Sequence, residues 1–76
     1  MAKSKKSTRE TLGAVLRGCR EDHGMTMVDM AAKCGLSQAQ ISRIETGNQG
    51  FRLSTLQQIA RVLGVKVSDL LTEAGL

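Results

Sequence analysis

Apolar residues recur at helical spacing along most of this chain, and no segment alternates in the way a strand does. Between Thr26 and Gly47 the pattern defines two short amphipathic helices, since each half of the segment has one apolar face. Three further helices are expected around this pair, and proline is absent. We therefore predict an all-α fold. The apolar positions of the five segments, in chain order, are Leu12, Val15, Leu16, Cys19, Met30, Ala31, Cys34, Ile41, Ile44, Leu56, Ile59, Ala60, Leu63, Leu70 and Leu71.

The ends of the two central helices carry specific signals. Ser37 followed by Gln40 has the spacing of a capping box, and Thr26 followed by Asp29 repeats it one helix earlier. Gly35 stands where the first helix must end, because glycine adopts the left-handed conformation that closes a helix. These signals predict a helix-turn-helix over residues 26–46.

Capping signals also mark the flanking helices. Ser7 with Glu10 predicts the start of the first helix, and Ser54 with Gln57 predicts the start of the fourth. Gly64 is expected to end the fourth helix, after which a short last helix follows.

The outward face of the helix after Ser37 is polar and short, and its side chains suit base edges. Glutamine pairs with adenine, arginine with guanine, and an alanine methyl can meet a thymine methyl. An ordinary solvated face has the same residue types, so the face alone favours the surface interpretation, and the preceding turn shifts the balance towards DNA. The residues on this face are Gln38, Ala39, Ser42, Arg43 and Thr46.

The run LRGCREDHGMTMVDMAAKCGLSQAQISRIETG, followed by LSTLQQIARVLGVKVSDLL, resembles the Cro and phage-repressor type of helix-turn-helix domain, the XRE family. The resemblance covers about Leu12 to Leu71. It implies a compact five-helix domain in which the helix beginning at Ser37 lies in the major groove of double-stranded DNA.

By this resemblance, particular positions acquire roles. The base-reading positions are Gln38, Ala39, Ser42 and Arg43. The positions assigned to the DNA backbone are Thr26, Met27, Ser37, Thr46, Asn48, Gln49 and Arg52. The chain departs from the family at Met27, where a glutamine often holds a phosphate, because a methionine side chain donates no hydrogen bond.

The resemblance also matches Arg20 and Glu45 to an internal ion pair behind the reading helix. A physical argument agrees, since Glu45 lies one turn after Ile41, near the buried side, and a buried carboxylate needs a cationic partner. The alternative is two independent surface charges.

The net charge of +4 is concentrated at the start of the chain. The first ten residues hold four basic residues and one acidic residue, which leaves seven basic and six acidic residues for the remainder. We predict a flexible basic arm over residues 1–6 and one domain over residues 7–76. Lys3, Lys5 and Lys6 are candidate DNA contacts, and a solubilising tail is the alternative.

Other function classes find little support. No apolar stretch approaches the ~18 residues of a membrane span, and no signal region is evident, so we expect a cytoplasmic protein. Cys19 and His23 have a plausible metal-ligand spacing and Cys34 is a third possible donor, but no fourth ligand is evident, so we expect buried thiols without a metal or a disulfide. With one histidine and no glycine-rich phosphate loop, we predict no enzyme, no metal and no cofactor.

The C-terminal apolar residues predict self-association. A core this small often needs help from oligomerisation, and the last segment offers more apolar surface than such a core absorbs. We expect a symmetric homodimer that represses transcription by binding an inverted-repeat, palindromic operator. The predicted interface residues are Val67, Leu70, Leu71 and Leu76.

Two alternatives remain open at this stage. An antitoxin-type protein would bind a toxin partner and its own promoter, and the apolar pair Met27 and Val28 would suit such a protein contact. A controller protein of a restriction-modification system would also activate transcription, through RNA polymerase.

Overall fold

The computed structural model describes residues 8–48, 50 and 52–75, and all regular structure among them is helical. The helices are α1 (Thr8–Asp22), α2 (Met27–Cys34), α3 (Gln38–Thr46), α4 (Leu53–Leu63) and α5 (Val67–Glu73). The all-α class and the five-helix arrangement are as predicted. None of the helices in this part of the chain is long and apolar enough to cross a membrane.

Both predicted capping boxes of the central pair are formed. The Thr26 hydroxyl accepts from the Asp29 amide at 3.0 Å, and the Thr26 amide donates to the Asp29 carboxylate at 3.2 Å. Ser37 and Gln40 exchange the same two bonds at 3.1 and 2.8 Å. Gly35 closes α2 with a φ of 69°, a value that L side chains rarely adopt. The tight corner between α2 and α3 is therefore fixed by local hydrogen bonds and one glycine.

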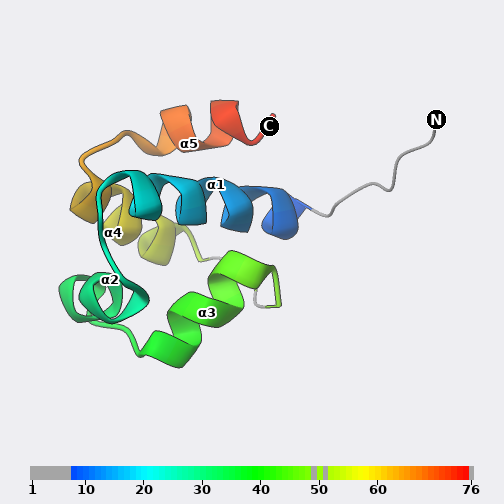
Figure 1. Cartoon of the computed structure of the whole chain (residues 1–76). Helices are drawn as coiled ribbons and strands as arrows, with labels where there is room; N and C mark the ends of the chain where they lie inside the picture. The colour runs from blue at the N-terminus through cyan, green and yellow to red at the C-terminus, as the bar shows by residue number, and fades with distance from the viewer. Residues whose placement is uncertain (1–7, 49, 51, 76) are drawn as a thin grey trace.

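Helix α1 is the centre of the arrangement, with α5 along one side and α3 along the opposite side (Figure 1). Helix α2 contacts α3 and α4, so the five helices enclose one core. Every helix contributes aliphatic or thiol side chains to it. The buried apolar residues are Leu12, Leu16, Met30, Ala31, Cys34, Ile41, Ile44, Leu56, Ile59, Ala60, Leu63, Leu70 and Ala74.

The start of α4 differs from the prediction. Ser54 is not the capping residue, because α4 begins at Leu53 and its N-cap is Arg52, which makes no side-chain capping bond. The first intrahelical bond runs from the Leu56 amide to the Arg52 carbonyl at 3.0 Å. That bond places Ser54 inside the first turn, where its hydroxyl cannot cap the helix. The predicted cap at Ser7 lies outside the described residues.

The expectation that Leu70 faces a partner is wrong. Its side chain is only 1% exposed, because α5 folds back over α1 and α4 and turns Leu70 into the protomer's own core. Val67 and Leu71 are half-buried and pack against the same core. Leu76 lies outside the described residues.

Candidate nucleic-acid interface

The four predicted base-reading residues lie on α3, the helix that follows the tight corner. Gln38, Ala39 and Arg43 are exposed, and Ser42 is half-buried. Ile41 and Ile44 on the opposite face are buried in the core. Helix α3 therefore presents a polar, hydrogen-bonding surface outward while its apolar side holds it to the domain.

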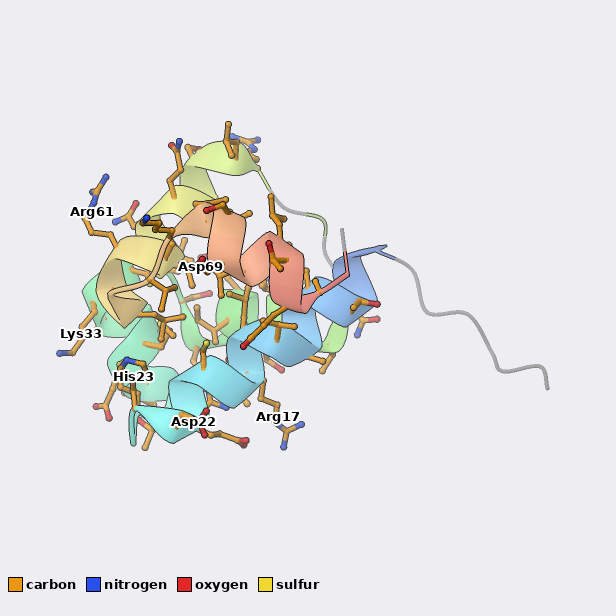
Figure 2. The ribbon with its side chains drawn as sticks, turned by 90° about the horizontal axis from the view of Figure 1, so that it is seen from above. Arg17, Asp22, His23, Lys33, Arg61 and Asp69 are labelled. Carbon is orange, nitrogen blue, oxygen red and sulfur yellow. The ribbon has the colours of Figure 1, made fainter. Side chains whose placement is uncertain are left out.

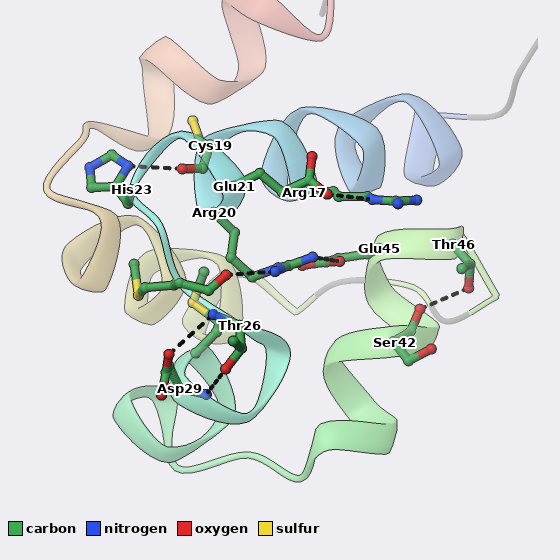
Figure 3. A network of polar contacts seen from close by, with 12 residues as sticks. Arg17, Cys19, Arg20, Glu21, His23, Thr26, Asp29, Ser42, Glu45 and Thr46 are labelled. Carbon is green, nitrogen blue, oxygen red and sulfur yellow. Dashed lines mark hydrogen bonds and ion pairs between the residues drawn. The ribbon is translucent and has the colours of Figure 1, made fainter.

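An ion pair crosses from α1 to α3 behind this surface (Figure 3). The Glu45 carboxylate accepts from Arg20 Nε at 2.7 Å and from Arg20 Nη2 at 3.1 Å, so the contact is bidentate. The two side chains are only 8% and 4% exposed. Arg20 and Glu45, expected to pair, thus form a buried bridge between the two helices.

The same guanidinium reaches a third acceptor, which sequence reasoning missed. Arg20 Nη1 donates to the Met25 carbonyl oxygen at 2.7 Å, and the Met25 amide donates back to the Arg20 carbonyl at 3.1 Å. A backbone acceptor leaves no signal in residue type, so no sequence pattern could indicate it. The hydrogen bond to Glu45 raises the pKa of Arg20 above its already high value, against the effect of burial. The arginine is held charged where α1, the following loop and α3 meet.

The end of α3 is occupied by local hydrogen bonds. The Thr46 hydroxyl donates to the Ser42 carbonyl at 2.8 Å, and Asn48 Nδ2 donates to the Thr46 hydroxyl at 3.2 Å. Gly47 closes the helix with a φ of 81°. A phosphate contact from the Thr46 hydroxyl would require its proton to leave the Ser42 carbonyl.

The first turn of α2 is divided between the core and the surface. Met27 is half-buried against the core, whereas its neighbour Val28 is 57% exposed. Hydrogen bonds from the Thr26 backbone and side chain hold the pKa of the Asp29 carboxyl below its ordinary value. Of the apolar pair singled out in the sequence, Val28 is exposed and Met27 is half-buried.

Arg52 is the N-cap of α4. It lines an open hollow together with residues of the corner, of α3 and of α4. The other residues of this lining are Leu36, Gln40, Gly50 and Thr55. Arg52, which is exposed, and Gln40 of α3 thus line the same hollow. The remaining predicted contacts, Lys3, Lys5, Lys6 and Gln49, lie outside the described residues.

Both cysteines are free thiols, and no three metal-ligand side chains gather within the part of the chain that the structure describes. Cys34 is buried, and burial raises the pKa of its thiol. His23 Nδ1 lies 2.8 Å from the Cys19 carbonyl oxygen, at the end of α1. Figure 2 shows Arg17, Lys33 and Arg61 pointing outward from the ribbon, and Asp22 and His23 at the end of α1. All five of these side chains, those of Arg17, Asp22, His23, Lys33 and Arg61, are exposed.

Two short helices joined at a glycine corner, with the second helix buried on one side and polar on the other, define a helix-turn-helix domain. The chain belongs to the HTH_3 helix-turn-helix family, whose model matches residues 16–70. This is the family, also called XRE, that the sequence motifs predict.

Relatives and solved structures agree with this assignment. The HTH-type transcriptional repressor RghR of Bacillus subtilis is 36% identical over 67 residues, which cover 87% of this chain and 50% of RghR. The chain thus spans about half the length of this curated relative. The clp gene regulator ClgR from Corynebacterium glutamicum superposes with a TM-score of 0.92 at 32% identity, covering 97% of this chain and 95% of that chain. The biofilm regulator SinR, solved in complex with DNA, gives a TM-score of 0.75 at 28% identity, with 79% and 97% covered.

Proposed function

We propose that this protein is a sequence-specific DNA-binding transcription regulator, a repressor that reads its operator with α3. The observation that carries the proposal is the outward face of α3, where Gln38, Ala39 and Arg43 are exposed on a helix braced from behind by a buried ion pair. A short helix that is held at the surface by the tight corner between α2 and α3 has the shape that enters a major groove. The repressors and regulators among its relatives support the same role.

Arg43 is the residue that we assign to base reading, because it is exposed on α3 and its guanidinium can bond the edge of a guanine. A bidentate contact between arginine and guanine contributes about 1–3 kcal/mol of discrimination, or about 5–150-fold in affinity. The DNA sequence that the protein prefers is first selected from a random pool. Arg43→Ala should then weaken binding to that sequence by such a factor and relax the preference at one base pair.

Arg61→Ala is the matched control, because Arg61 is likewise an exposed arginine in the last turn of its helix. Removing either charge alters the net charge equally, so a loss confined to Arg43→Ala separates base reading from general attraction to phosphate. Equal affinities of the two variants for the selected sequence, with both proteins folded, would show that α3 does not read DNA through Arg43.

The proposed repressor acts as a homodimer on an inverted repeat. Val67 and Leu71 on α5 are only half-buried, and α5 lies on the side of α1 opposite to α3 (Figure 1). In a twofold dimer the two α3 helices would meet half-sites about 34 Å apart. Sedimentation equilibrium should give twice the protomer mass, and the selected DNA should be palindromic. A monomeric protein with a non-palindromic preference would refute this part of the proposal.

An antitoxin-type function is the second candidate, and the exposure of Val28 favours it. Val28, which is 57% exposed in the first turn of α2, is accessible to a protein partner. A stoichiometric companion that co-purifies with the wild-type chain and is lost in Val28→Lys would support this function. A companion retained by the variant would count against Val28 as its contact.

A further inference from the structure

Helices α1 and α3 meet at a glycine that has no part in the face that reads DNA. Gly13 is buried, and a Cβ built on it would lie 2.7 Å from the Glu45 carbonyl oxygen and 3.0 Å from the Glu45 carbonyl carbon. The carbonyl oxygen of Ile44 would lie closer still. These atoms are backbone atoms of the last turn of α3, so no side chain can rotate aside to make room.

Gly18, on the same helix, provides the comparison. A Cβ built there meets nothing within 4 Å. Glycine in a helix interior is unfavourable relative to alanine, and at Gly18 no neighbouring atom requires it. At Gly13 the absence of a side chain is what permits the two backbones to approach each other. The close approach to the α3 backbone is therefore found at Gly13 and not at Gly18.

The consequence for α3 follows from how its two ends are held. The first turn is fixed by the Ser37 and Gln40 capping box and by the corner from α2. The last turn is fixed against α1, by the approach at Gly13 and by the bidentate bridge from Arg20. A methyl group at Gly13 would displace the last turn while the first stayed in place, and α3 would tilt.

We infer that Gly13 is a positioning residue for DNA reading, which sets the tilt of α3 and therefore the relative placement of Gln38 and Arg43 on the groove. The inference rests on the proposed function of α3. It assigns to Gly13 a role in specificity, since a tilted helix loses the alignment of its base contacts but keeps its charge. Contacts with phosphate, which carry no sequence information, depend less on that alignment.

The test compares Gly13→Ala with Gly18→Ala. The affinity of each variant is measured for the DNA sequence that the wild type selects and for an unrelated duplex of equal length, at a temperature where circular dichroism shows the variant to be folded. We expect Gly13→Ala to lower the ratio of the two affinities at least ~10-fold, mainly through the selected sequence. Gly18→Ala should keep the wild-type ratio.

A second readout follows the geometry directly. The Arg20 Nε–H resonance reports the bridge to Glu45, and it should shift in Gly13→Ala but not in Gly18→Ala. If Gly13→Ala is unfolded in buffer, both measurements are made in trimethylamine oxide, which favours compact states. A folded Gly13→Ala protein with the wild-type affinity ratio would overturn the inference. Selection of no preferred sequence by the wild type would instead refute the proposed function.

Discussion

Replacing Arg20 by methionine should be among the most destabilising single changes in this domain. The substitution keeps an unbranched side chain but removes the charge, and it leaves the Glu45 carboxylate without a partner at 4% exposure. Breaking a buried ion pair from one side costs about 3–5 kcal/mol, because the remaining charge stays desolvated. A chain of this length has a total stability of about 4–11 kcal/mol, so the variant should be marginally folded.

The double variant Arg20→Met with Glu45→Leu separates the charge from the packing. With both charges gone, an apolar pair of similar volume should recover most of the loss, since buried ion pairs and apolar replacements are often of similar stability. The recovery should fall short by about 1 kcal/mol, because the Met25 carbonyl also loses the 2.7 Å bond that Arg20 donates. Urea unfolding followed by far-ultraviolet circular dichroism gives the free energy of unfolding of the wild type, of Arg20→Met and of the double variant.

Arg17→Met is the matched control on the same helix. Arg17 pairs with Glu21 at 3.2 Å, but the two side chains are 60% and 54% exposed. Such a pair is expected to contribute about 0.3–0.5 kcal/mol and to weaken as salt is added, whereas the buried pair should be nearly insensitive to salt. If Arg20→Met lowered the free energy of unfolding no more than Arg17→Met, the buried pair would not contribute as expected. A double variant as unstable as Arg20→Met would show that packing, and not the unpaired carboxylate, dominates.

Two further predictions concern the core. Leu70→Ala should lower the free energy of unfolding by about 2–5 kcal/mol at every protein concentration, because Leu70 is buried within the protomer. Urea unfolding at two protein concentrations checks this prediction. A loss that appears at only one concentration would indicate that Leu70 contributes to a subunit interface. Burial raises the pKa of the Cys34 thiol, so its contribution to stability is complete below about pH 8.5 and is lost as the pH rises through the raised pKa. Above that pH, the free energy of unfolding of Cys34→Ala, measured by urea titration, should therefore decline less steeply with pH than that of the wild type. Equal slopes against pH would contradict the raised pKa of Cys34.

The helix ends that the sequence predicted correctly are encoded locally, whereas the Arg20 and Glu45 pair, 25 residues apart, was expected from the family resemblance and the burial of Glu45. Capping boxes and glycine corners use residues within three or four positions of one another, so their hydrogen bonds depend little on the rest of the fold. Thr26 with Asp29, Ser37 with Gln40, and Gly35 all behave in this way. The same signal was misleading at Ser54, because Leu56 already closes the first turn of α4 with the Arg52 carbonyl. A Ser and Gln pair with capping-box spacing, such as Ser54 and Gln57, does not reveal from sequence alone at which residue the helix begins.

The features that the sequence did not predict depend on long-range packing. Leu70 has the apolar character of both a core residue and an interface residue, and only the return of α5 across α1 distinguishes them. Gly13 is separated by thirty-one residues from Ile44, whose carbonyl oxygen it approaches. A glycine inside a helix can mark a close backbone approach, as at Gly13, or none, as at Gly18, and spacing alone does not distinguish the two.

The charge distribution explains why the rigid placement of α3 should matter for this protein in particular. Beyond the first ten residues the chain holds seven basic and six acidic residues, so general attraction to phosphate is weak there. Two of those basic side chains, Arg17 and Arg20, are already paired with carboxylates of the protein itself. Arg20 is used to brace α3 and cannot also contact DNA. If α3 reads DNA as proposed, a domain with a buried arginine holding that helix and little net charge should owe its selectivity to the geometry of α3.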